Sequence, residues 1–196
     1  MKSKNDTRNG FTLVETMVAI SLLTVAIVAP MALTAQSLGS AYYARDQVTA
    51  YYLAQEAIES VRAIRDGQIL CIAKNDCPAG NNNLFGAIPN NTPFRIDVRT
   101  GAIHACNADP GGNCIPLQTD GTLYGYQDGG PGTWTNTNFT RTAIACYVQS
   151  DGTCTGTPTD EMQVRVTVSW QTEGIQARTF TISSDLYRWI NDGSGV

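Results

Sequence analysis

The chain has 196 residues with a formal net charge of −4, and 15% of its residues are charged. This length fits one domain with an additional segment and excludes two large domains. The acidic balance argues against a general nucleic-acid-binding surface, because binding to phosphates needs an excess of lysine and arginine.

A short polar leader precedes a long apolar run. The leader ends at Gly10, and no charged side chain occurs in residues 16–44. Residues 16–35 supply the roughly 20 mostly apolar residues with which a helix crosses a bilayer. The positive excess before this run predicts a cytoplasmic N-terminus and an exported remainder. The charged residues of the leader are Lys2, Lys4, Asp6 and Arg8, and removing the leader would leave the chain at about −6.

Two simple interpretations of the apolar run are open. A secretory signal peptide has a charged region, an apolar region and a small-residue cleavage site after it. Here no clean cleavage pattern follows the run, and the acid Glu15 lies at its start. A plain single-span anchor is the other interpretation, and it leaves Gly10 and Glu15 unexplained.

The order of glycine, phenylalanine, acid and long apolar helix in residues 10–20 resembles the N-terminal signature of type IV prepilins and type II secretion pseudopilins. This resemblance implies that a prepilin peptidase cuts between Gly10 and Phe11 and methylates the new N-terminus of Phe11. It also implies that Glu15 pairs with the terminal amine of a neighbouring subunit during assembly. An acid in a membrane helix is costly and needs such a partner, although a glutamate near the membrane surface can also snorkel to water.

Residues 11–66 are predicted to form one long helix. Its first half, residues 11–35, would span the membrane and later pack in a filament core, and Pro30 should kink it. The second half, residues 36–66, is amphipathic, and Gly67 is expected to end it in the left-handed conformation. The apolar stripe consists of Ala50, Leu53, Ala54, Ala57, Ile58, Val61 and Ile64, and Arg45, Asp46, Glu56, Glu59 and Arg62 lie largely off it. This half resembles the corresponding helix of PilV-like minor pilins and I-type minor pseudopilins.

Residues 67–138 are predicted to be a loop-rich variable region with short strands. Residues 94–99 alternate apolar and charged side chains, as a half-buried strand does, and are expected to pair with residues 102–106 across a short turn. Acids in the turns permit a calcium site, but they lack the order of a calcium-binding loop, and such acids usually accept hydrogen bonds from turn amides. These acids are Asp109, Asp120, Asp128 and Asp151. An exposed adhesive patch of Tyr126, Gln127 and Trp134 is a further possibility.

Residues 139–196 are predicted to form a C-terminal antiparallel sheet. Apolar and polar side chains alternate over part of residues 139–148 and over all of residues 162–170. The alternation in residues 162–170 places five large apolar side chains on one face. A turn at residues 173–174 would lead into residues 176–183, whose Phe180 and Ile182 share that face. A sheet packed on one amphipathic helix is an α+β arrangement and matches the pilin fold that the N-terminal motif implies.

The six cysteines fall into three close pairs, each of which brackets a turn. In an exported domain an even number of cysteines indicates disulfides. Fifteen connectivities are possible, and we expect the local pairing, with zinc as the alternative. The pairs are Cys71 with Cys77, Cys106 with Cys114, and Cys146 with Cys154.

No catalytic constellation is evident, and the chain has one histidine. We therefore predict a structural protein with no cofactor and no metal site. The resemblance implies a single-pass inner-membrane prepilin whose C-terminal domain is exported and then joins an extracellular or periplasmic filament. It implies as partners other pilin or pseudopilin subunits, prepilin peptidase, an inner-membrane assembly platform, and lipid before assembly. A minor pilus subunit is preferred, and the alternatives are a minor pseudopilin, a major pilin, or a filament-borne adhesin or DNA-uptake module.

Overall fold

The computed structural model describes residues 10–77, 83–127, 133–171 and 176–190. The leader residues 1–9, Asp128 and the turn predicted at residues 173–174 lie outside the described residues. The elements in chain order are α1 (Leu13–Lys74), β1 (Phe94–Asp97), β2 (Ala102–Ala105), the 3₁₀ turns η1 (Cys106–Ala108) and η2 (Pro110–Gly112), β3 (Gln118–Thr119), β4 (Tyr124–Gly125), β5 (Thr135–Asn136), β6 (Phe139–Val148), β7 (Cys154–Thr155), β8 (Glu161–Trp170) and β9 (Arg178–Tyr187).

The chain divides into two compact units, residues 1–44 and residues 45–196. In the first unit, α1 exposes the side chains of residues 13–38 on all sides. The helix continues through Pro30, whose carbonyl oxygen accepts a hydrogen bond from the Thr34 hydroxyl at 2.8 Å. Within the described residues, α1 is long and apolar enough to cross a membrane.

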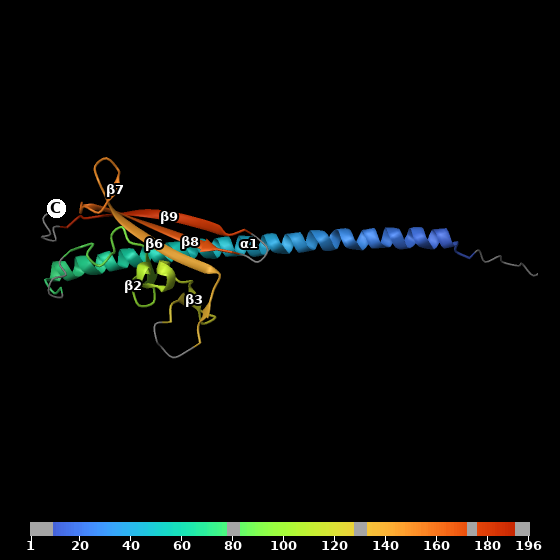
Figure 1. The fold of residues 1–196 in the computed structure, drawn as a ribbon, viewed down its shortest axis with the longest axis horizontal. Helices are drawn as coiled ribbons and strands as arrows, with labels where there is room; N and C mark the ends of the chain where they lie inside the picture. Colours follow the sequence, from blue (N-terminus) through green and yellow to red (C-terminus); the bar gives the residue numbers. More distant parts are fainter. Residues whose placement is uncertain (1–9, 78–82, 128–132, 172–175, 191–196) are drawn as a thin grey trace, which may run out of the picture. The chain divides into compact units, whose positions relative to one another are not determined.

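The second unit contains the main antiparallel sheet, with strand order β2-β1-β6-β8-β9 and with β7 paired to β6. The strands β6, β8 and β9 run beside α1, and β9 is the outermost of them (Figure 1). The predicted hairpin of β1 and β2 is confirmed, and its turn places Gly101 at a φ of 71°. The α+β architecture predicted from the sequence is therefore confirmed.

The inner face of the main sheet forms the core against α1. The alternation predicted for β8 is confirmed, since Met162, Val164, Val166, Val168 and Trp170 are all buried. On β9, Phe180 and Ile182 lie opposite Val168 and Val166 and therefore share this face, but they are only half-buried because β9 is an edge strand.

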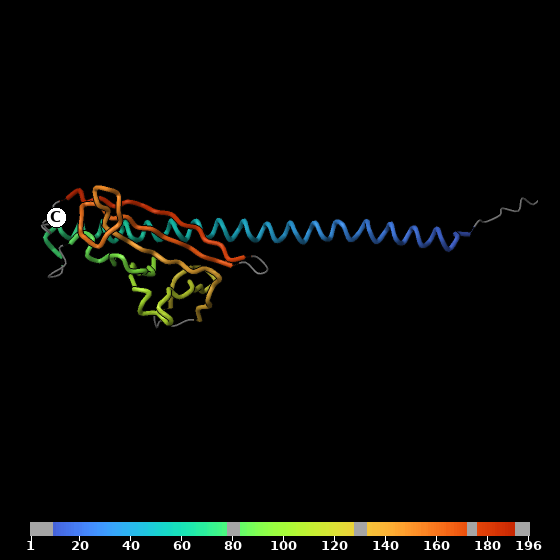
Figure 2. The backbone as a smooth tube through the Cα atoms, turned by 45° about the horizontal axis from the view of Figure 1, so that its top comes forward, coloured from blue at the N-terminus to red at the C-terminus, as the bar shows by residue number. Residues whose placement is uncertain are grey.

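A second, three-stranded sheet with the order β4-β3-β5 was not predicted. Its strands have two residues each, which is too short for a periodic pattern. They lie within the yellow-green to amber part of the chain beside β6 (Figure 2).

The part of α1 in the second unit buries the predicted stripe. Ala50, Leu53, Ala54, Ala57, Ile58 and Val61 are buried, and Ile64 is half-buried. Asp46 was expected off the stripe but is only 4% exposed, beside Arg45, whose Nη2 lies 3.3 Å from its Oδ1.

The predicted end of the helix at Asp66 and Gly67 is wrong. The helix continues eight residues further to Lys74, and the buried residues Gln68 and Ile69 hold the additional turns against the domain. A glycine inside a helix costs only about 1 kcal/mol relative to alanine, which this burial offsets. The boundary predicted between residues 66 and 67 therefore moves to Lys74.

Asn75 ends the helix in place of Gly67. It has a φ of 54°, its N–H donates to the Ile72 carbonyl oxygen at 3.0 Å, and the Asp76 N–H donates to the Cys71 carbonyl oxygen at 3.1 Å. These two bonds form a Schellman motif, in which a left-handed residue satisfies the last carbonyl groups.

Replacing Asn75 with alanine should lower the free energy of unfolding by about 1 kcal/mol, because alanine tolerates the left-handed conformation poorly. Asn75→Gly is the matched control and should keep or raise the stability, since glycine adopts this conformation freely. Urea unfolding of the three proteins checks this, and equal stability of the alanine and glycine variants would contradict it.

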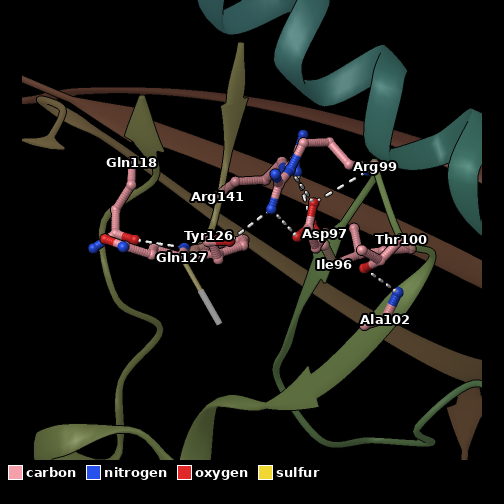
Figure 3. A network of polar contacts seen from close by, with 9 residues as sticks. All are labelled: Ile96, Asp97, Arg99, Thr100, Ala102, Gln118, Tyr126, Gln127 and Arg141. Carbon is pink, nitrogen blue, oxygen red and sulfur yellow. Dashed lines mark hydrogen bonds and ion pairs between the residues drawn. The ribbon is translucent and has the colours of Figure 1, made fainter. Parts of the chain in front are cut away.

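Arg141 on β6 connects the sheet to the helix from within the core. It is 1% exposed, and its Nη1 donates to the Leu53 carbonyl oxygen at 3.0 Å and to Glu56 Oε2 at 3.1 Å. Its Nη2 donates to the Ile96 carbonyl oxygen of β1 at 2.8 Å. One guanidinium therefore links α1, β1 and β6. Figure 3 shows Arg141 near Ile96 of β1.

Candidate functional site

The start of α1 is the candidate functional site, and Thr12 caps it. The Glu15 N–H donates to Thr12 Oγ1 at 3.3 Å, and the Thr16 N–H donates to the Thr12 carbonyl oxygen at 3.2 Å. Threonine followed three residues later by glutamate is the pattern of a capping box. Glu15 also lies where the helix dipole favours a negative charge. Sequence reasoning missed this local role, although the spacing of Thr12 and Glu15 carried the signal.

The peptide bond between Gly10 and Phe11 lies just before this cap, among exposed residues. The side chain of Phe11 is 81% exposed, and Gly10 and Glu15 are exposed as well. A Cβ added at Gly10 would meet no atom within 4 Å, so nothing in the described chain itself requires glycine there.

The hydroxyl groups of the apolar helix are bonded to its own backbone. The hydroxyls of Thr16, Ser21, Thr24 and Thr34 each donate to a carbonyl oxygen three or four residues earlier at 2.8 Å. Polar groups that lie in hydrocarbon must find their hydrogen-bond partners within the protein. These side chains are therefore compatible with lipid or with an apolar protein environment.

The start of α1 is the part of the chain that matches a known family. A glycine, an aromatic residue and an acid begin a long apolar helix, and the same helix packs on an antiparallel sheet, as in a prepilin-like chain. Residues 5–29 match the family model of the prokaryotic N-terminal methylation motif. The chain thus carries the N-terminal signature of the type IV prepilin and pseudopilin family, as the sequence indicated. Neither a curated protein nor a solved structure matches the chain.

The cysteines form three local disulfides. Cys71 is joined to Cys77, Cys106 to Cys114 and Cys146 to Cys154, with sequence separations of 6, 8 and 8 residues. All six cysteines are used, which leaves no thiolate ligand for the zinc alternative.

Three of the four turn acids that permitted a calcium site interact with other groups of the chain, and the fourth, Asp128, lies outside the described residues. Asp109 Oδ2 lies 3.0 Å from Arg95 Nε. Asp120 Oδ1 accepts hydrogen bonds from two turn amides at 2.8 Å each, and these bonds hold the pKa of Asp120 below its usual value. Hydrogen bonds from Thr153 lower the pKa of Asp151 in the same way. Within the part of the chain that the structure describes, no group of three metal ligands occurs.

Two arginines of the β1 hairpin hold the small sheet, as Figure 3 shows for Arg99. Arg99 Nη2 donates to Asp97 Oδ2 at 2.9 Å and to the Tyr126 carbonyl oxygen at 2.8 Å. Its guanidinium carbon lies 4.4 Å from the centre of the Trp134 ring, and that of Arg95 lies 4.5 Å from the centre of the Tyr126 ring. Such cation–π contacts contribute about 0.5–2 kcal/mol each.

The proposed adhesive patch of Tyr126, Gln127 and Trp134 is therefore wrong. Tyr126 is 1% exposed, and the other two are half-buried. Burial raises the pKa of Tyr126. The aromatic rings fasten the small sheet to the β1 hairpin. No local sequence pattern indicates these arginine partners, because they lie in a different segment of the chain.

Gly125 lets β4 approach the β1 hairpin closely. A Cβ there would lie 2.7 Å from Arg99 Nε and 3.3 Å from Asp97 Oδ1. We expect Gly125→Ala to displace Arg99 and to lower the free energy of unfolding by about 1–2 kcal/mol. Gly156→Ala is the matched control, because its nearest neighbours lie at 3.6 Å. Equal unfolding midpoints for the two variants in urea would contradict this role of Gly125.

Proposed function

We propose that this chain is a structural, non-enzymatic subunit of a type IV pilus or a related filament, and that it is a minor subunit. The match of residues 5–29 to the N-terminal methylation motif is the observation that carries the proposal. Prepilin peptidase would cut between Gly10 and Phe11 and methylate Phe11. The mature chain would then leave the inner membrane through an assembly platform and join the filament.

The exposed apolar surface of α1 supports this proposal. Large side chains from Leu13 to Leu38 are 51–75% exposed, and such a helix requires lipid or other apolar helices around it. In our proposal lipid surrounds residues 11–35 before assembly, and the same segment of sister subunits replaces the lipid afterwards. The leader lies in the cytoplasm, and the second unit lies outside.

Terminal analysis of the protein tests the proposal. The chain should be purified from membranes of a host that contains prepilin peptidase and examined by mass spectrometry. We expect a chain that begins with N-methylated Phe11. A chain that keeps residues 1–10 in this host would overturn the proposal.

Glu15 is proposed to pair with the methylated amine of a neighbouring subunit during assembly. Glu15→Gln keeps a hydrogen-bonding side chain at the third position of the helix but removes the charge. We expect incorporation into filaments to fall by about tenfold or more, since a charge left alone in an apolar environment is strongly unfavourable. Quantitative immunoblotting of sheared filaments measures this.

Thr12→Ala is the control that separates pairing from capping. It removes the hydroxyl that accepts the Glu15 N–H and costs about 1 kcal/mol of helix stability, but it keeps the Glu15 carboxylate. Incorporation of this variant should stay near the wild-type level. If both variants lose incorporation equally, the role of Glu15 is in capping the helix and the pairing role is excluded.

A further inference from the structure

The strand β9 is a long, regular edge of the main sheet. It pairs with β8 without a bulge through ten residues, from Arg178 opposite Trp170 to Tyr187 opposite Glu161. In an antiparallel pair, alternate residues direct their N–H and C=O groups away from the partner strand. Among the described residues, no backbone group outside β8 bonds to residues 179–187. The outward backbone groups of this stretch can therefore pair with another strand.

This edge lacks the features with which proteins usually protect edge strands. It contains no proline and no bulge, and its charged side chains, Arg178 and Asp185, lie near its two ends. Natural sheets shorten, twist, charge or cover long edges, because an open edge is a template for another chain. Residues 179–184 carry none of these features, so this part of the edge is open to pairing with another strand.

An apolar groove lies directly beside the same edge. It is lined by Gln47, Val48, Tyr51 and Tyr52 of α1 and by Phe180 of β9, and has a volume of about 360 Å³. Two of the lining rings, those of Tyr51 and Phe180, meet edge to face with centres 5.6 Å apart. Two other lining side chains are largely exposed, Val48 by 55% and Tyr52 by 64%.

We propose that the β9 edge and this groove, together the β9 site, bind an extended segment of another protein by strand addition. The backbone of the segment would pair with residues 179–187, and one apolar side chain would enter the groove beside Phe180. A strand edge combined with a groove against a helix is a recurrent way to bind extended peptides: main-chain bonds supply affinity, and pockets for alternate side chains supply specificity.

The chemistry of the groove selects the bound segment. None of its five lining residues is charged, and residues 179–184 of the strand carry no charge. Burying an unpaired charge there would be unfavourable. The segment is therefore uncharged over its centre, with aliphatic or aromatic side chains at alternate positions.

A second copy that uses its own β9 does not fit this site. Two β9 strands related by a twofold axis run in opposite directions, whereas the subunits of one filament share a direction. The choice of another protein over a second copy rests on the proposed function. The strand-addition site is independent of the proposed function, because all its residues belong to the second unit.

The test uses the full chain in detergent micelles and a synthetic peptide of alternating threonine and valine with one terminal lysine. NMR spectra of the labelled protein should show shifts confined to residues 179–187 and 47–52, and amide exchange in residues 179–187 should slow. Val48→Glu places a charge in the groove and should weaken binding by about tenfold. Ile144→Glu, at an exposed aliphatic residue on the outer face of β6, should bind the peptide as the wild type does.

Two N-methylated peptides make the test specific for strand addition. Methylation of alternate amides on one edge of the peptide should abolish binding, and methylation of the other set should leave it unchanged. Equal effects of the two peptides, or no binding at millimolar peptide, would overturn the proposal. Self-association of the chain through residues 179–187 without peptide would also overturn it in favour of a second copy. None of these measurements depends on cleavage or filament assembly, so their failure leaves the proposed function untouched.

Discussion

Replacing Gly10 with leucine should abolish removal of the leader, so that the membrane form keeps residues 1–10. In the proposed function prepilin peptidase recognises Gly10, and a bulky side chain at this position is expected to prevent that recognition. The chain itself should not be disturbed, because a Cβ at Gly10 meets no atom within 4 Å. Intact-mass measurement of the membrane fraction, with and without prepilin peptidase, checks this result.

Gly39→Leu is the matched control for this prediction. Gly39 lies in the same unit, and a Cβ there also meets no atom within 4 Å. This variant should be cleaved as the wild type is. Normal cleavage of Gly10→Leu would contradict the role of Gly10, and loss of cleavage in both variants would indicate a general defect in membrane insertion.

Replacing Arg141 with alanine should lower the free energy of unfolding of the second unit by about 3 kcal/mol. The truncation removes the ion pair with Glu56 and leaves the buried carbonyl oxygens of Leu53 and Ile96 without this donor. Glu56 is 44% exposed and can be rehydrated, which keeps the loss below that of a fully buried pair. Urea unfolding followed by tryptophan fluorescence measures the change.

Two variants control the Arg141 prediction. Arg165→Ala removes an exposed arginine from the outer face of the same sheet and should change the stability by less than about 0.5 kcal/mol. Arg141→Met fills the space with an apolar chain, and should recover part of the loss because replacing a buried charge by a packed side chain is often tolerated. If Arg141→Ala and Arg165→Ala unfold at the same urea concentration, Arg141 does not hold the helix to the sheets.

The parts of the fold that the sequence predicted are those with a long periodic pattern. The alternation in residues 162–170 and the stripe from Ala50 to Val61 each repeat over several turns or pleats, and both were confirmed. The helix end was missed, because Gly67 is a strong local stop signal while the burial of Gln68 and Ile69 depends on tertiary packing.

The rest of the second unit depends on contacts between distant residues. Nothing near Arg141 in the sequence indicates that its guanidinium reaches Leu53, 88 residues away. The small sheet is likewise fastened through Arg95 and Arg99, whose aromatic partners lie in a different segment. At the candidate site the sequence motif was sufficient for the resemblance, since residues 10–15 act as a local signal, but the capping role of Thr12 emerged from the hydrogen bonds.

The placement of the disulfides determines how the domain responds to tension. Each bond closes a short loop, with sequence separations of 6 or 8 residues, and the bonds leave α1 without a covalent cross-link to β6, β8 or β9. A pulling force between the ends of the domain is therefore resisted by noncovalent contacts, among them the strand ladder, the apolar core and the hydrogen bonds of Arg141. Once these contacts break, most of the domain can extend at about 3.3–3.6 Å per residue, so that the domain can lengthen under load without breaking a covalent bond.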